Sequence, residues 1–140
     1  MRAAQSQSET KTGIIEIALD GEMIAITFKP QAETSATSRI APHDAVVLSC
    51  LMLRSCTLHE TVNIAIANLA LMVEGGKRSL GWFTMMRDGK PHVIARLDAT
   101  SIRDLGRRIH DQYLRAVEVD SDGPERSIFV RRVAYRQVEA

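Results

Sequence analysis

The chain has 140 residues, of which 45% are hydrophobic and 25% are charged, and its formal net charge is +1. This is the commonest length for one domain, and the composition excludes a chain that is disordered throughout. The near-neutral total charge gives no overall attraction to nucleic acids or to membrane surfaces.

Residues 1–12 are mostly polar, so we expect a flexible N-terminal arm followed by a single α+β domain over residues 13–140. The arm contains no apolar stretch of the kind that a signal peptide requires. We therefore expect a cytoplasmic protein with reduced cysteines.

Asp20-Gly21 lies between two alternating apolar segments, residues 14–19 and 22–28, and predicts a β-hairpin. A two-residue turn at this dipeptide places Ile17 opposite Ile24. Residues 29–42 are rich in Ser, Thr and Ala, and we expect a connecting loop there.

The most unusual feature is an apolar block, in which 20 of the 29 residues from 45 to 73 are apolar. Six polar residues divide it, namely Arg54, Ser55, Thr57, His59, Glu60 and Thr61, so neither run reaches the ~20 residues that a membrane span needs. We expect two buried helices instead. The first begins near His43 with Asp44 as its N-cap, and the second begins at a capping box formed by Thr57 and Glu60.

The second expected helix has two apolar stripes. One contains Leu58, Val62, Ala65, Leu69 and Met72, and the other contains Ile64, Ala67 and Leu71. A helix that is apolar on nearly all sides must be covered on more than one of them. We therefore expect the second stripe to bind a partner, either another copy of the chain or another protein.

The rest of the chain predicts a second hairpin, a third helix and a last strand over residues 127–138. The hairpin pairs residues 80–87 with 92–97 across the loop 88–91. The third helix begins at Ser101 and has a core stripe made of Ile102, Leu105, Ile109, Tyr113 and Ala116. The resulting order, ββ-αα-ββ-α-β, favours an antiparallel sheet with helices packed on one face.

No constellation of residues indicates an enzyme, a metal site or a cofactor. Cys50, Cys56, His43 and His59 are the candidate metal ligands, but their spacing does not match the close C-x₂₋₄-C pairs of zinc sites. No Ser, Cys or carboxylate stands in a recognisable nucleophile or acid–base context. We expect a protein that is not an enzyme and that holds no cofactor.

Positive charge is concentrated in residues 75–115, which contain nine Lys and Arg against four Asp and Glu. Four of these cations, Lys77, Arg78, Arg87 and Lys90, are expected at a helix end and a hairpin tip, where they can meet an acidic partner. Asp104 and Asp111 each precede an arginine by four residues, a spacing that favours ion pairs along a helix.

These patterns predict a small cytosolic, non-enzymatic binding or regulatory protein that acts through an apolar helical surface and self-associates. The alternative is a nucleic-acid-associated protein that uses the basic segment 77–115. The residues expected to bind the partner are Ile64, Ala67, Leu71, Lys77, Arg78, Arg87 and Lys90.

Overall fold

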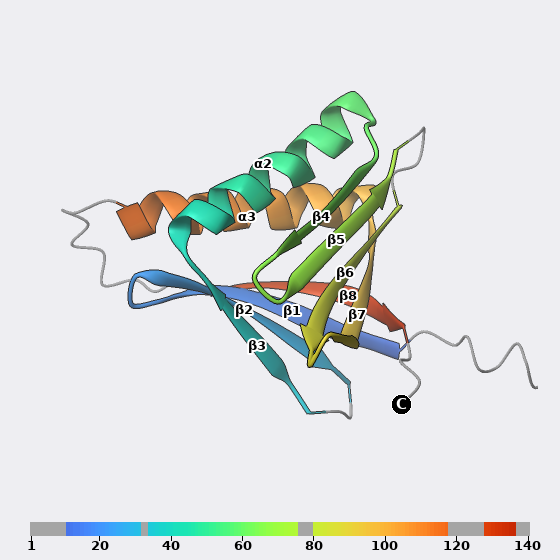
Figure 1. Ribbon diagram of the computed structural model, residues 1–140, viewed down its shortest axis with the longest axis horizontal. Coiled ribbons are helices and arrows are strands. Elements are labelled where there is room, and N and C mark those ends of the chain that lie inside the picture. Colours follow the sequence, from blue (N-terminus) through green and yellow to red (C-terminus); the bar gives the residue numbers. More distant parts are fainter. Residues whose placement is uncertain (1–10, 32–33, 76–79, 118–127, 137–140) are drawn as a thin grey trace, which may run out of the picture.

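The computed structural model describes residues 11–31, 34–75, 80–117 and 128–136. They form one small α+β domain (Figure 1). Its elements in chain order are β1 (Lys11–Asp20), β2 (Met23–Pro30), β3 (Ala36–Ile40), α2 (Pro42–Leu58), β4 (Val62–Ile66), β5 (Leu69–Glu74), β6 (Leu80–Arg87), β7 (Lys90–Asp98), α3 (Ala99–Val117) and β8 (Phe129–Arg136).

All the strands form one antiparallel sheet in the order β3-β2-β1-β8-β7-β6-β5-β4. The last strand, β8, lies between β1 and β7 and joins two meanders of sequential strands. The sheet curls strongly, and α2 and α3 lie side by side in its hollow (Figure 1). None of the described helices is long and apolar enough to cross a bilayer.

The core fills the space between the inner face of the sheet and the two helices. Alternate residues of every strand point inward, because side chains alternate between the two faces of a strand. They meet the buried stripe of α3, which contains Ile102, Leu105 and Ile109 as expected, with Tyr113 and Ala116 packed at its margin.

The two helices cross closely at a glycine. A Cβ added at Gly106 of α3 would lie 3.0 Å from the Cβ of Met52 and 3.2 Å from the Cγ of Leu53 on α2. Nearby on α2, Ser49 and Ser55 are fully buried, and their hydroxyls donate to the carbonyls of Val46 and Met52. The absence of a side chain at Gly106 lets α2 approach α3 closely, and the two serine hydroxyls are satisfied within α2 itself.

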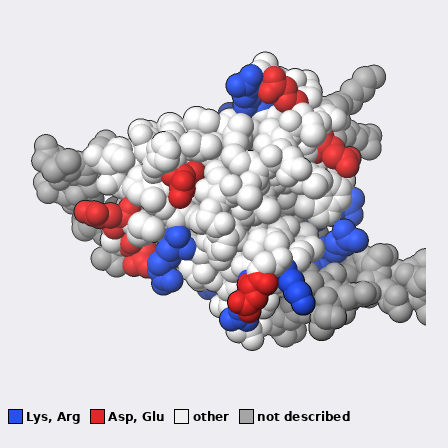
Figure 2. Space-filling model, in the orientation of Figure 1, with Lys and Arg blue, Asp and Glu red and all other residues white. Residues whose placement is uncertain are grey.

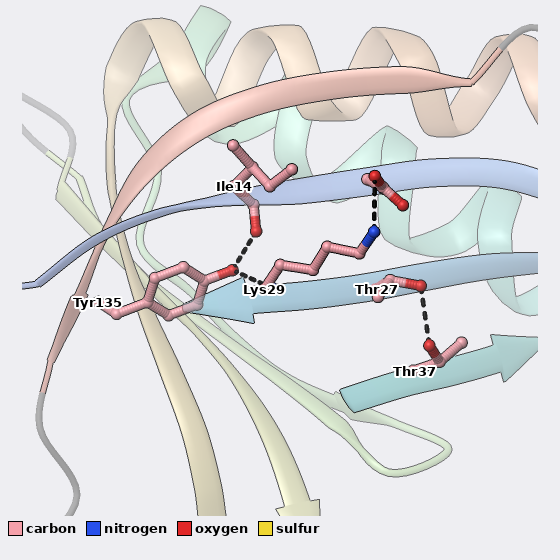
Figure 3. A network of polar contacts seen from close by, with 6 residues as sticks. Ile14, Thr27, Lys29, Thr37 and Tyr135 are labelled. Carbon is pink, nitrogen blue, oxygen red and sulfur yellow. Dashed lines mark hydrogen bonds and ion pairs between the residues drawn. The ribbon is translucent and has the colours of Figure 1, made fainter. Parts of the chain in front are cut away.

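A tyrosine hydroxyl binds the backbone of two neighbouring strands (Figure 3). Tyr135 of β8 donates to the Ile14 carbonyl on β1 and accepts from the Lys29 amide on β2, at 3.1 Å. Its ring crosses Gly13, where a Cβ would lie only 2.7 Å from the ring. Burial raises the pKa of Tyr135 above its ordinary value, so the phenol stays protonated.

The α+β class, the antiparallel sheet and the packing of helices on one face are confirmed, but the predicted element order is wrong. The order of the elements in the described residues is βββ-α-ββββ-α-β. The helix expected after Thr57 does not exist. The first helix continues to Leu58 and ends at His59, whose φ of 54° is left-handed, and Glu60 binds Arg54 at 3.0 Å instead of capping a helix.

Residues 62–73 form the β4–β5 hairpin rather than a helix. Val62 and Ile66 on β4, and Leu69, Leu71 and Val73 on β5, are buried at every second position. Because the intervening residues are also mostly apolar, the helical and strand periods were both satisfied, and the β-branched residues of β4 favour the strand.

The predicted loop and both predicted turns also need correction. Residues 29–42 contain β3, which pairs with β2. In the first hairpin Gly21, with φ 63°, is the first turn residue, so Ile17 faces Ile26 and not Ile24. In the second, Asp88 and Gly89 alone form the turn, and β7 begins at Lys90 with a bulge beside Met86.

The start of the third helix is also corrected. The helix α3 begins at Ala99, and Asp98 caps it by accepting from the Ser101 amide at 2.8 Å. This hydrogen bond holds the pKa of Asp98 below its ordinary value. At α2, the N-cap position is Ala41 and Asp44 lies in the first turn, so the expected Asp44 cap is wrong as well.

Candidate binding surface

The β4–β5 hairpin forms one edge of the sheet, and its only charged residue is Glu74 at the end of β5. Residues 61–73 contain no Lys, Arg, Asp or Glu. On the face of the molecule shown in Figure 2, the area over β4 and β5 is likewise free of charge, and the charged groups lie around it. The hairpin is therefore an apolar edge exposed in an otherwise normally charged protein.

The other edge of the sheet, strand β3, carries a charged side chain. There β3 exposes Arg39, which is paired with Asp20. Natural sheets protect their edges with charges, prolines or bulges, because an unprotected edge pairs with other chains. None of these three devices is present in β4.

The free edge of β4 exposes the backbone of Asn63 and Ala65. The β4–β5 turn has two residues, so Ile66 and Leu69 form a hydrogen-bonded pair beside it. Because such pairs alternate along an antiparallel ladder, Ile64 and Val62 also bind β5. The N–H and C=O groups of Asn63 and Ala65 then point away from β5, and in the described part of the sheet no strand lies on that side.

Ile64 lies at the centre of this edge and is only half-buried. Its side chain is on the inner face of the sheet, between Val62 and Ile66, which are 7% and 8% exposed. A helix or loop lying along the middle of the strand would bury Ile64 as fully as its neighbours. Its partial exposure indicates that this part of the edge is open.

The hairpin is held rigidly in place. The Asn68 carbonyl accepts from the Met86 amide of β6 at 2.7 Å, and the Asn68 side chain is hydrogen-bonded to Ser38 of β3. At the other end of the hairpin, the Thr61 hydroxyl accepts from the Gly75 amide at 3.1 Å. A rigid edge binds with little ordering cost, because its backbone is already extended.

An apolar strip on the outer face of the sheet adjoins the edge. Asn63, Met72, Trp82 and Arg96 face outward in register on four successive strands. Met72 is 45% exposed and Trp82 is half-buried, and the first charge in this row is that of Arg96. Asn63, Trp82 and the outer position of Met72 could not be predicted from the sequence, because outward and inward residues are distinguishable only when the strands are assigned.

The predicted partner-binding residues are separated by the structure. Ile64 lies on the edge, and Ala67 is exposed in the β4–β5 turn with φ 54°. Leu71 is 1% exposed and belongs to the core of the chain itself, so the expectation that it faces a partner is wrong. Arg87 and Lys90 are exposed at the β6–β7 turn, and Lys77 and Arg78 lie outside the described residues.

The basic segment does not form one patch in the described part of the chain. The β6–β7 turn lies at the far end of the sheet from α3 (Figure 1). Four arginines lie exposed on α3, namely Arg103, Arg107, Arg108 and Arg115. Arg96 is on the outer face of the sheet, which is the side opposite to α3.

The ion pairs around α3 differ from those expected. Asp104 binds Arg131 of β8 at 2.7 Å rather than Arg108, and Arg108 lies 4.0 Å from Asp111 and stacks over Phe129. The Asp104–Arg131 pair is two-thirds buried and fastens α3 to the sheet. Asp104 therefore stabilises the fold and is not free to neutralise the surface of α3.

The candidate metal ligands do not come together. Cys50 is exposed and Cys56 is half-buried, with its Sγ 3.5 Å from the Ala99 carbonyl. In the described parts of the chain, no group of three His, Cys, Asp or Glu side chains is placed to hold a metal ion. Burial raises the pKa of the Cys56 thiol, which makes it a weaker nucleophile at neutral pH.

A small hollow of about 190 Å³ lies between α3 and the start of β8. It is lined by Arg108, Asp111, Gln112, Arg115, Ile128, Phe129 and Val130. Both Gln112 and Arg115 are engaged in interactions, and Arg108 is held over Phe129. Because these side chains are already engaged in interactions within the chain, the β4 edge is the better candidate for a binding surface.

Comparisons of the chain with protein-family models, with curated proteins and with solved structures find no match.

Proposed function

We propose that this protein is a small, non-enzymatic binding protein that self-associates through its uncharged edge strand β4. The observation that carries the proposal is the absence of any charge, proline or bulge on β4, a rigid strand that ends the sheet. In a protein that acts as a monomer, such an edge is a site of uncontrolled pairing. A dedicated partner on this edge removes that hazard.

The binding surface extends beyond the edge itself. Met72 and Trp82 continue the uncharged area onto the outer face of β5 and β6. Partly exposed methionine and tryptophan side chains are typical of the centres of protein interfaces. The surface is thus built from a hydrogen-bonding edge and an adjoining apolar face, and not from a helical stripe.

A nucleic-acid role stays a prediction with less support. The arginines and lysines of residues 77–115 that the structure describes are divided between a hairpin turn, the outer sheet face and α3. Nucleic-acid binding depends on several cations that contact phosphates of the same strand or groove. Because these cations lie on separate surfaces, fewer of them can contact the same strand or groove, and binding to a nucleic acid is weaker.

The test is the mass of the protein in solution, measured by light scattering between about 1 and 100 µM. We expect the wild type to be a dimer or larger and Ala65→Lys to be a folded monomer, because Ala65 is exposed on the edge strand. Ala65→Thr is the matched control, since threonine suits a strand and adds no charge. A wild type that is monomeric throughout this range would refute the proposal.

The same samples test the alternative function. Fluorescence anisotropy with labelled DNA and RNA at low salt should show no tight binding. Binding that weakens steeply with salt, and that is lost when Arg87 and Lys90 are both replaced by Ala, would instead support the nucleic-acid role.

A further inference from the structure

We propose that β4 pairs antiparallel with β4 of a second copy of this chain, about a twofold axis at Ile64, so that the two sheets become continuous. This inference rests on the proposed function and names the occupant of the β4 edge and its register. It follows from the hydrogen-bonding groups, the burial and the charge of β4.

The free backbone groups of β4 are self-complementary. Asn63 and Ala65 each direct one donor and one acceptor away from β5, because the two-residue turn makes Ile64 and Ile66 the residues that bind β5. When two such edges meet antiparallel, Asn63 of each copy faces Ala65 of the other. Both residues of each facing pair then exchange two hydrogen bonds, which gives four across the interface.

This register also covers the residue that the monomer leaves incompletely buried. With Asn63 facing Ala65, the two Ile64 side chains meet on the axis as a non-hydrogen-bonded pair, in which side chains are closest. Ile64 is the half-buried inner residue between buried Val62 and Ile66. A contact between two β-branched side chains fills this open position.

The neighbouring registers satisfy fewer of these conditions. A shift that places Ala65 opposite Ala65 brings Asn63 against Ala67, whose φ of 54° removes it from the strand. A shift that places Asn63 opposite Asn63 brings Ile64 against Val62, which is already buried, and pairs Ala65 with Thr61, which lies before the strand. Only the Ile64-centred register uses both free residues of β4 and covers Ile64.

The charge of β4 favours a second copy over an acidic or basic partner. A twofold axis places each residue near its own equivalent, so any charge at the centre would face a like charge and destabilise the pair. Residues 61–73 contain no charged residue. The opposite edge strand, β3, exposes Arg39 and is unsuited to the same arrangement.

Disulfide trapping tests the register. In a chain with Cys50→Ser and Cys56→Ala, Ile64→Cys places one thiol of each copy on the axis. The Cβ atoms of such a non-hydrogen-bonded pair lie about 4.5 Å apart, at the upper end of the ~3.5–4.5 Å that a disulfide needs. Mild oxidation should convert more than half of this variant into a covalent dimer on a non-reducing gel.

Met72→Cys in the same background is the matched control. Met72 is 45% exposed on β5, and its equivalent in the second copy lies three strand spacings away, roughly 14 Å. This is too far for a disulfide, so Met72→Cys should stay uncrosslinked. Equal crosslinking of the two variants would mean random collision and would overturn the proposed pairing.

Removal of one outward N–H is the second test. Ala65→Pro deletes a donor that points away from β5, so the intramolecular ladder of the hairpin is kept. We expect the dissociation constant of the dimer to rise at least tenfold, whereas Ala65→Thr keeps the N–H and should dimerise. Should Ala65→Pro fail to fold, the crosslinking result alone decides.

The outcomes separate this inference from the proposed function. A wild-type dimer in which Ile64→Cys does not crosslink would overturn β4 pairing and leave self-association standing. A wild type that is monomeric by light scattering would overturn both.

Discussion

The Tyr135 hydroxyl offers the most direct test of how the central strands are held together. Tyr135 is 3% exposed, and its hydroxyl bonds the Ile14 carbonyl and the Lys29 amide. Tyr135→Phe keeps the ring in contact with Phe28 but leaves one donor and one acceptor without this partner. Each buried polar group left unsatisfied costs about 1–3 kcal/mol, and partial closure of the ladder recovers some of it, so we expect a loss of roughly 2 kcal/mol.

Urea denaturation at pH 7, followed by circular dichroism, measures this loss as a lower midpoint with an unchanged slope. The control is Tyr113→Phe, which alters a half-buried tyrosine on α3 and should change the free energy of unfolding by less than about 0.5 kcal/mol. If Tyr135→Phe also costs less than about 0.5 kcal/mol, then β1 and β2 pair without the hydroxyl and the reasoning is refuted.

The pH dependence gives an independent check. The pKa of Tyr135 is raised in the folded protein above its ordinary value of 10.0. Above about pH 10 the unfolded chain therefore releases this proton while the folded chain keeps it, and the stability of the wild type falls. The phenylalanine variant lacks this proton, so the difference in stability between the two proteins should narrow as the pH rises above 10.

Other substitutions test the hairpin, the helix cap and the turn. Leu71→Asp should unfold the chain, because burying a charge adds to the about 2–5 kcal/mol of lost packing, whereas Met72→Asp on the outer face should stay folded by circular dichroism. A folded Leu71→Asp monomer would contradict the core position. Asp98→Ala should cost about 1 kcal/mol in urea at pH 7. That cost should shrink as the pH falls below about 4, because the lowered pKa makes the contribution of Asp98 one that is lost in acid. Ala67→Gly should raise the thermal midpoint, with a gain of about 1 kcal/mol from relieving its left-handed backbone; an unchanged or lower midpoint would show that the turn is not strained.

Local signals in the sequence were sufficient where polar and apolar residues alternate clearly. The Asp20-Gly21 hairpin and the core stripe of α3 have a polar face that reveals the period, and both are confirmed in type. The exact pairing was less predictable, because Gly21 occupies the first turn position rather than the second and shifts each partner by two residues.

The β4–β5 hairpin could not be recognised, since residues 62–73 lack the polar face that separates the helical from the strand period. Thr57 and Glu60 match a capping box, which also favours a helix, but Thr57 lies in the last turn of α2 and Glu60 binds Arg54. The excess of apolar residues is visible in the sequence, but its meaning depends on whether residues 62–73 form a helix or two strands. As a helix it placed Leu71 on the surface, and as a strand it exposes the backbone of Asn63 and Ala65.

The central position of β8 has a consequence for how the chain folds during synthesis. The strands β1–β3 and β4–β7 form two meanders of sequential neighbours, which can assemble through short turns as they leave the ribosome. Their union requires β8, whose pairing with β1 joins residues 11–17 to residues 129–135. Such distant contacts form slowly, because a long loop must close before they are gained. Until then the nascent protein has two extra unpaired edges, β1 and β7, so the period before β8 docks is the time when it is most exposed to aggregation and most dependent on chaperones.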